Sequence, residues 1–155
     1  MTGRALMAIA AVLFSTAVWA ESSATHPNAE LAPEEVVRCQ MQALGANDEQ
    51  DNGIAIAFRF ASPANKRVTG PLTRFIDMIK NSAYSVMLDY ELIEYGEVDV
   101  RDDRASLPVR VLTSDFLAVE FRFFLSRQTH AECDGCWMTD AVNVVDVRRV
   151  PGLKT

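Results

Sequence analysis

The sequence predicts an α+β domain, with N-terminal helices packed on one face of a four-stranded antiparallel sheet. Two observations carry this prediction. Apolar residues recur at helical spacing as far as about residue 80. From about residue 89 onward they alternate with polar residues, as in strands that bury one face. Helices that precede a run of such strands favour an antiparallel sheet covered on one side.

The first helix is predicted to begin at Pro33. Proline is tolerated in the first turn of a helix, and Glu34 and Glu35 place negative charge at the positive end of the helix dipole. Gly45 and Asn47 are plausible end signals. The apolar stripe of this helix consists of Val36, Val37, Met41, Ala43 and Leu44.

Two more helices are predicted before the sheet. The pattern of residues 54–60 fits a strand or a helix, and its short distance from the first helix favours a short helix. Residues 62–66 are predicted to form a turn, because Pro and Asn favour turn geometry. Thr69-Gly70-Pro71 then predicts the entry to another helix, which Asn81 and Ser82 would end. Its apolar stripe consists of Leu72, Phe75, Ile76 and Ile79.

The sheet is predicted from four alternating segments. Turns are expected at residues 101–104 and 113–115, and Asp134-Gly135 leads into the last strand. The third strand is long, and its alternate apolar residues from Leu117 to Leu125 mark a buried face. The predicted strands are Leu92–Val100, Ala105–Val111, Leu117–Leu125 and Trp137–Val147.

The first twenty residues predict a secretory signal peptide. Arg4 supplies a positive charge, Ala5 to Phe14 form a short apolar run, and Val18-Trp19-Ala20 fits a cleavage site. The apolar run is shorter than the ~20 residues of a membrane span, although an uncleaved anchor is the alternative. We therefore expect cleavage after Ala20 and a soluble mature protein in the periplasm or outside the cell.

The mature chain is expected to contain one folded domain. Residues 21–32 are predicted to be a flexible leader, residues 33–148 the domain, and residues 149–155 a C-terminal tail. Loss of Arg4 with the signal peptide takes the formal net charge from −6 to −7. Nucleic acids and anionic lipids are poor partners for such a surface, because both require clustered Lys or Arg.

The three cysteines suggest a structural disulfide. Cys133 and Cys136 flank Asp-Gly, the preferred two-residue hairpin turn, and residues that face each other across a hairpin lie ~5.5 Å apart. Two inert thiols or a thiol-exchange site are the alternatives. A zinc site would need His130, Glu132 or the distant Cys39 as further ligands, so no metal or cofactor is predicted.

Five residues are candidates for binding. Glu120 and Arg122 share one face of the long strand, with Arg110 near them. Inside a cavity these charges could orient a polar ligand, whereas on a solvated face, the favoured interpretation, they form an ordinary cross-strand ion pair. Tyr84 and Asp140 could exchange protons if they converge in a pocket, although tyrosines more often pack their rings and keep the hydroxyl in water.

Several motifs resemble one uncharacterised family of small exported bacterial proteins with relatives in plants, domain of unknown function forty-eight sixty-four (DUF4864). The likeness covers about residues 33–145 and is most specific in Phe60-Ala61-Ser62-Pro63-Ala64-Asn65-Lys66. Further points of likeness are Gly70-Pro71, Phe75, Tyr84 and Gly135-Cys136-Trp137.

The family is similar to the SnoaL-like and nuclear-transport-factor-two-like superfamily, which implies a cone made by a curved antiparallel sheet around N-terminal helices. That superfamily includes isomerases, dehydratases, ligand binders and dimerisation modules, so the resemblance implies no single activity. Its enzymes usually place a catalytic Asp or His in the cone, and no predicted strand here contains His.

We therefore expect a non-enzymatic exported domain that binds a small molecule or a partner protein in a cone-shaped pocket. Two alternatives stay open. One is a small acid–base enzyme of the isomerase or dehydratase type, with a carboxylate and a tyrosine in the cone. The other is a homodimeric scaffold module, suggested by the long strand and its large apolar side chains. Phosphate-binding loops and the Gly-x-Ser-x-Gly and His-Glu-x-x-His motifs are absent from the sequence.

Overall fold

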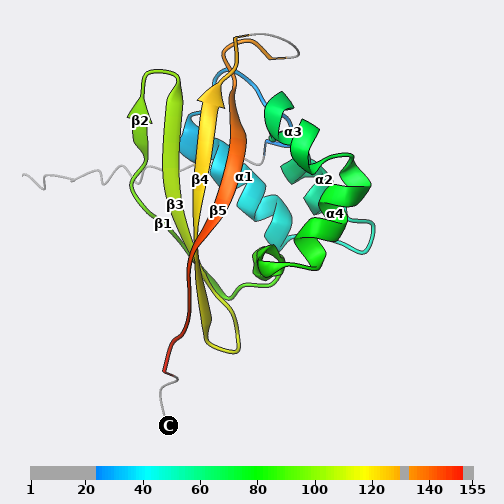
Figure 1. The fold of residues 1–155 in the computed structure, drawn as a ribbon, viewed down its shortest axis with the longest axis vertical. Helices are drawn as coiled ribbons and strands as arrows, with labels where there is room; N and C mark the ends of the chain where they lie inside the picture. Colours follow the sequence, from blue (N-terminus) through cyan, green and yellow to red (C-terminus); the bar gives the residue numbers. More distant parts are fainter. Residues whose placement is uncertain (1–23, 130–132, 152–155) are drawn as a thin grey trace, which may run out of the picture.

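The computed structural model describes residues 24–129 and 133–151, and it confirms the α+β class (Figure 1). Within these residues, four α-helices and one 3₁₀ helix precede a five-stranded antiparallel sheet. The helices are α1 (Pro33–Gly45), α2 (Asn52–Arg59), α3 (Pro63–Thr69), α4 (Leu72–Lys80) and η1 (Ala83–Met87). The strands are β1 (Leu92–Tyr95), β2 (Asp99–Arg101), β3 (Arg104–Leu112), β4 (Leu117–Arg127) and β5 (Trp137–Arg149).

The sheet has the order β1-β3-β4-β5, with the short β2 also paired to β3. The single first strand predicted over Leu92–Val100 is wrong, because it is divided into β1 and β2. Three residues from Gly96 to Val98 lie opposite only Leu107 and Pro108 of β3. Pro108 has no N–H to continue the ladder, and a Cβ on Gly96 would lie 2.5 Å from its Cγ.

The helices lie together on one side of the sheet, and the core fills the space between the two layers (Figure 1). α1 contacts both β3 and β5. β3 and β4 bury alternate residues against this layer, which confirms the period-two pattern of the sequence. The largest fully buried side chains include Met41, Ile54, Phe60, Leu107, Phe121, Phe123 and Leu125.

Pro63 to Lys66 belong to helix α3, so the turn predicted over residues 62–66 is wrong. Ser62 is the N-cap of α3, and its hydroxyl accepts a hydrogen bond from the N–H of Asn65 at 3.2 Å. Pro63 occupies the first turn. A Ser followed by Pro is a strong helix start, because the serine caps a free N–H group and the proline lacks one.

The described segment that precedes α1 packs against the domain. The predicted signal peptide lies outside the described residues. Leu31 is buried at 7 % exposure, and the N–H of Ala32 donates to the carboxylate of Glu35 at 2.7 Å. Ala24 also packs against the core, and the carbonyl of Thr25 accepts a hydrogen bond from Arg59 at 3.3 Å, so part of the predicted flexible leader is in contact with the domain.

Gly53 allows α2 to pack closely on α1. A Cβ built on this buried glycine would lie 2.0 Å from the carbonyl oxygen of Ala43 and 2.8 Å from the Cα of Asn47. Both atoms belong to the backbone, so they cannot move aside without shifting the helices. The absence of a side chain at this position sets the distance between the first two helices.

We expect Gly53→Ala to lower the free energy of unfolding by about 2–3 kcal/mol, because the new methyl group forces two helices apart. Urea unfolding of both proteins measures the difference. Gly45→Ala is the matched control. Its Cβ would meet the hydroxyl of Tyr90 at 2.7 Å, the end of a side chain that can move, so a smaller loss is expected. Equal losses for the two variants would contradict the proposed role of Gly53.

Candidate functional site

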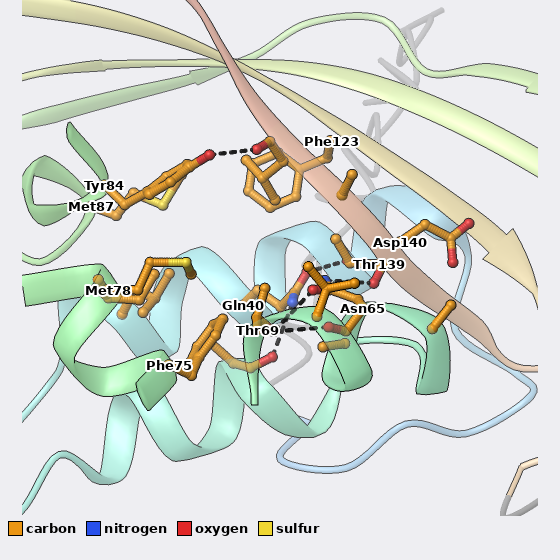
Figure 2. A pocket seen from close by; sticks show the side chains of 18 residues that line it. Gln40, Asn65, Thr69, Phe75, Met78, Tyr84, Met87, Phe123, Thr139 and Asp140 are labelled. Carbon is orange, nitrogen blue, oxygen red and sulfur yellow. Dashed lines mark hydrogen bonds between the residues drawn. The ribbon is translucent and has the colours of Figure 1, made fainter. Parts of the chain in front are cut away.

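A cavity of about 440 Å³ lies between the helices and β5 (Figure 2). Eighteen residues line it, drawn from all four α-helices, η1, β4 and β5. Its walls are mainly apolar, and the large contributors are Phe75, Met78, Ile79, Tyr84, Met87 and Phe123. The two methionines are flexible and polarisable, so they can adapt to ligands of different shape.

The cavity is open because four of its lining positions carry small side chains. Ala57, Ala61, Ala64 and Ala141 surround it from α2, the α2–α3 connection, α3 and β5. Larger apolar residues at these positions would reach into the space that is now empty. The helix layer and the sheet therefore leave room at these positions, beside a firm contact that forms one wall of the cavity.

The firm contact is a buried polar cluster formed by α1, α2 and β5. Thr139 Oγ1 donates to Gln40 Oε1 at 2.6 Å, and Gln40 Nε2 donates to the carbonyl of Ala57 at 3.0 Å. Gln40 is 5 % exposed and Thr139 is 1 % exposed. Buried polar groups are costly when unpaired, so this mutual pairing is required for the contact to be stable.

The main chain of Thr139 also bonds to the α2–α3 connection. Its N–H donates to the carbonyl of Phe60 at 2.8 Å, and its carbonyl accepts from the N–H of Ser62 at 2.8 Å. The side-chain amide of Asn65 donates to the same carbonyl at 3.0 Å, and the hydroxyl of Thr69 bonds to Asn65. The segment from residue 60 to residue 66 thus joins the helices to the edge of β5.

Tyr84, one of the predicted binding residues, lines the cavity. Its hydroxyl donates to the carbonyl of Val142 at 2.7 Å, and its ring stacks on Phe121 with centroids 5.9 Å apart. Burial raises the pKa of the Tyr84 hydroxyl above its ordinary value, so the group stays protonated at neutral pH. Because its proton is already donated to the main chain, Tyr84 is better placed to shape the wall than to transfer a proton.

Asp140 also lines the cavity, on the far side from Tyr84. It lies at a register shift of β5, between residues paired to Phe124 and Leu125. Figure 2 shows its carboxylate directed away from the polar cluster and from Tyr84. Among the described residues it has no hydrogen-bond or ion-pair partner. The two groups that an acid–base mechanism would require share a cavity, but they do not converge.

Comparison with known proteins gives a family. A family model matches residues 27–151, which is most of the chain. The chain belongs to that family, Domain of unknown function (DUF4864). No curated protein matches the sequence, and no solved structure matches the fold.

Three predicted binding residues of this DUF4864 domain lie on the outer face of the sheet, away from the helices. Arg110 Nη2 lies 3.1 Å from the Glu120 carboxylate, and Arg110 Nη1 lies 3.5 Å from that of Glu94. Arg122 shares the face of Glu120, opposite Pro108 and Asn143. Arg110, Glu120 and Glu94 form a partly exposed cross-strand ion network, worth ~0–1 kcal/mol for each pair, and Arg122 takes no part in it.

The hairpin cysteines of the DUF4864 domain are paired with each other. The structure joins Cys133 to Cys136 as a disulfide across the Asp-Gly turn, with Cα atoms 5.5 Å apart. Gly135 has a φ of 80°, the left-handed conformation that such a turn requires. Cys39 is buried in α1 and is not part of this bond. Cys39 is therefore not cross-linked to the hairpin.

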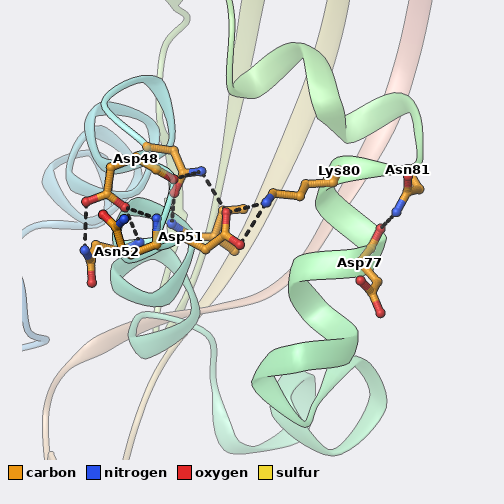
Figure 3. A network of polar contacts seen from close by, with 9 residues as sticks. Asp48, Asp51, Asn52, Asp77, Lys80 and Asn81 are labelled. Carbon is orange, nitrogen blue, oxygen red and sulfur yellow. Dashed lines mark hydrogen bonds and ion pairs between the residues drawn. The ribbon is translucent and has the colours of Figure 1, made fainter.

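A second polar cluster fixes the connection between α1 and α2 (Figure 3). Asp48 accepts hydrogen bonds from Gln50 and Asn52, the shortest at 2.7 Å from the Asn52 amide. Asp51 has a φ of 60° and forms an ion pair with Lys80 at 2.7 Å. Hydrogen bonds from Lys80 and then from Asn47 hold the pKa of the Asp51 carboxyl below its ordinary value. The cluster fastens α4 to the loop.

Neither a metal cluster nor a spanning helix appears in the part of the chain that the structure describes. No group of three or more His, Cys, Asp or Glu side chains is arranged to hold a metal ion there. In the same residues, no helix has both the length and the apolarity needed to cross a bilayer.

The polar side of the cavity was not predicted from the sequence. Gln40, Asn65 and Thr139 were not among the candidates, although Gln40 carries a detectable signal. It lies three residues after Val37 and four before Leu44, so it is a polar residue within the apolar stripe of α1. Such a residue must find a buried partner. The partner, 99 positions away in the sequence, could not be identified from spacing.

We expect Thr139→Val to lower the free energy of unfolding by about 1–3 kcal/mol, because Gln40 loses its buried donor while the shape of the side chain is kept. Chemical denaturation measures the loss. Thr73→Val, on the exposed face of α4, is the control and should change stability by less than about 0.5 kcal/mol.

Gln40→Leu added to Thr139→Val should restore part of the lost stability, because no acceptor at Gln40 then remains unpaired. If the double variant is as unstable as the sum of the two single variants, the coupling between these side chains is contradicted.

We expect Lys80→Met to raise the pKa of Asp51 toward its ordinary value of 3.8, measured by NMR titration of the carboxyl carbon. The pKa of Asp51 is lowered in the folded state, so its contribution to stability is present above pH ~4 and is lost as the pH falls through the folded pKa. The stability difference between the two proteins should therefore shrink in acid. Arg74→Met, also on α4 and exposed, should leave the Asp51 titration unchanged.

Proposed function

We propose that this protein is an exported domain that binds a small, uncharged and mainly apolar molecule in the cavity between α3, α4, η1 and β5. The cavity itself carries the proposal. Its volume of about 440 Å³ falls in the range of ~300–1,000 Å³ that is usual for small-molecule sites. Its walls combine aromatic rings, methionines and alanines, as in many sites for apolar ligands.

The polar groups of the cavity support an uncharged ligand. The hydroxyls of Thr139, Thr69 and Tyr84 already donate hydrogen bonds within the protein. A ligand therefore gains most of its affinity from apolar area, at ~25 cal/mol for each Å² removed from water. Asp140 is the one charged side chain among the described lining residues, so an anionic ligand would meet a like charge at the rim.

Export is supported by the composition of residues 1–20, and the fold supports a place in the SnoaL-like and nuclear-transport-factor-two-like superfamily. Helices that precede an antiparallel sheet, with a cavity between the two layers, match the cone that this superfamily implies. Acid–base chemistry is a weaker proposal, since Tyr84 donates to the main chain and Asp140 is directed elsewhere.

The neutral fluorescent probe N-phenyl-1-naphthylamine tests the proposal. We expect its emission to rise on binding to the purified protein. Ala64→Phe should weaken this binding by about tenfold, equivalent to ~1.4 kcal/mol, because the ring occupies part of the cavity. Ala83→Phe, at an exposed position outside the lining, should have no effect.

Competition identifies the charge preference. Decanol should displace the probe better than decanoate of the same chain length, because the carboxylate would be placed near Asp140. Absence of probe binding, or equal loss of binding in the two alanine variants, would refute the cavity as a binding site. Stronger displacement by decanoate would refute the preference for an uncharged ligand.

A further inference from the structure

We propose that the second half of β5 pairs with the same strand of a second copy, antiparallel, around a two-fold axis at Val147. This interaction surface lies beyond the cavity and is independent of the ligand proposed above. β5 is an edge strand, because β4 is its one neighbour in the described sheet. An open edge presents unpaired peptide groups that can accept another strand.

The first half of β5 is already covered. The peptide groups of Thr139 bond to Phe60 and Ser62, and the carbonyl of Val142 accepts the hydroxyl of Tyr84. Beyond this point, residues 143 to 149 are all exposed. Val145 is 52 % exposed and Val147 is 53 % exposed, so apolar area is present on the open half.

The hydrogen-bond pattern shows which peptide groups face the open edge. The carbonyl of Leu117 accepts from Thr113, so Leu117 directs its peptide groups toward β3 and away from β5. Leu117 and Arg149 of β5 therefore form a non-hydrogen-bonded pair. The backbone N–H and C=O of Arg149 consequently point away from β4, toward the open edge. Val119 and Val147 form the next pair of the same kind. Val147 thus offers both an N–H and a C=O to a neighbour.

The charges of this segment select the register. With Val147 opposite its own copy, Asp146 of each chain lies opposite Arg148 of the other, which gives two complementary cross-strand pairs. Centring the pairing on Asp146 or on Arg148 would place two like charges directly opposite. A self-complementary edge of this kind fits a second copy, because a two-fold interface uses the same surface on both chains.

The pairing is short. The register shift around Val145 interrupts the regular strand, so the paired segment runs from Val145 to Arg149 of each copy. Four valines, Val145 and Val147 of each copy, and two charge pairs per interface favour a reversible dimer over a permanent one.

Sedimentation equilibrium of the purified, processed protein, from low to high micromolar concentration, tests the proposal. We expect a concentration-dependent dimer. Asp146→Arg should raise the dimer Kd by about tenfold or more. The new arginine of each copy would lie opposite Arg148 of the other copy, so both charge pairs become repulsive. The exchange Asp146→Arg with Arg148→Asp should restore dimerisation, since the complementary pairs return in reversed order.

Thermal unfolding of the same variants shows whether the substitutions destabilise the fold. Asp146 lies opposite Glu120 of β4, so arginine at this position gains a favourable neighbour within its own chain. The substitution also removes the exposed ion pair between Asp146 and Arg148 of the same chain, at 3.6 Å, which is worth only ~0–1 kcal/mol. The unfolding temperature of Asp146→Arg should therefore stay close to that of the parent, and a loss of dimer then reports on the interface. A protein that is monomeric at every concentration, a dimer insensitive to Asp146→Arg, or a double exchange that fails to restore pairing would each overturn the proposal.

Discussion

The arrangement of this domain depends on one buried hydrogen bond, from the hydroxyl of Thr139 to the side-chain amide of Gln40. It places a polar group of α1 directly on β5, in a core where Ser62 is the one other buried polar residue among those described. Since an unpaired amide there would be costly, the helix and the strand can meet in essentially one register. The α2–α3 connection then bonds to the main chain of Thr139 and completes the contact.

The cavity is a consequence of this arrangement. The helical layer is held against β5 near Thr139, and the ion pair between Asp51 and Lys80 holds α4 to the α1–α2 loop. Between these fixed points, α3, α4 and η1 line an apolar space, which small side chains such as Ala64 leave unfilled. A scaffold fixed at its ends can keep an apolar space open, because closing it would require the polar contacts to break.

Local signals predicted most elements of the fold. Proline and acidic residues marked the start of α1, and strict alternation marked β3 and β4. The break between β1 and β2 occurs where Gly96 lies against Pro108 of the neighbouring strand. Gly96 is a signal within the segment, but its proline partner is known only once the strands are paired. The candidate site divides in the same way. Tyr84 and Asp140 were identified by residue type, whereas the pairing of Gln40 with Thr139 depends on the folded chain.

The sequence separation of these contacts has a consequence for how the domain folds. Gln40 and Thr139 are 99 positions apart, and the bonds from Asn65 to Thr139 and from Tyr84 to Val142 span 74 and 58 positions. Contacts this distant form late, because long loops must close first. The helices come first in the sequence, but the hydrogen bonds that fix their positions form only when β5 joins the sheet. The tertiary structure of this domain is therefore complete only after its C-terminal strand has paired.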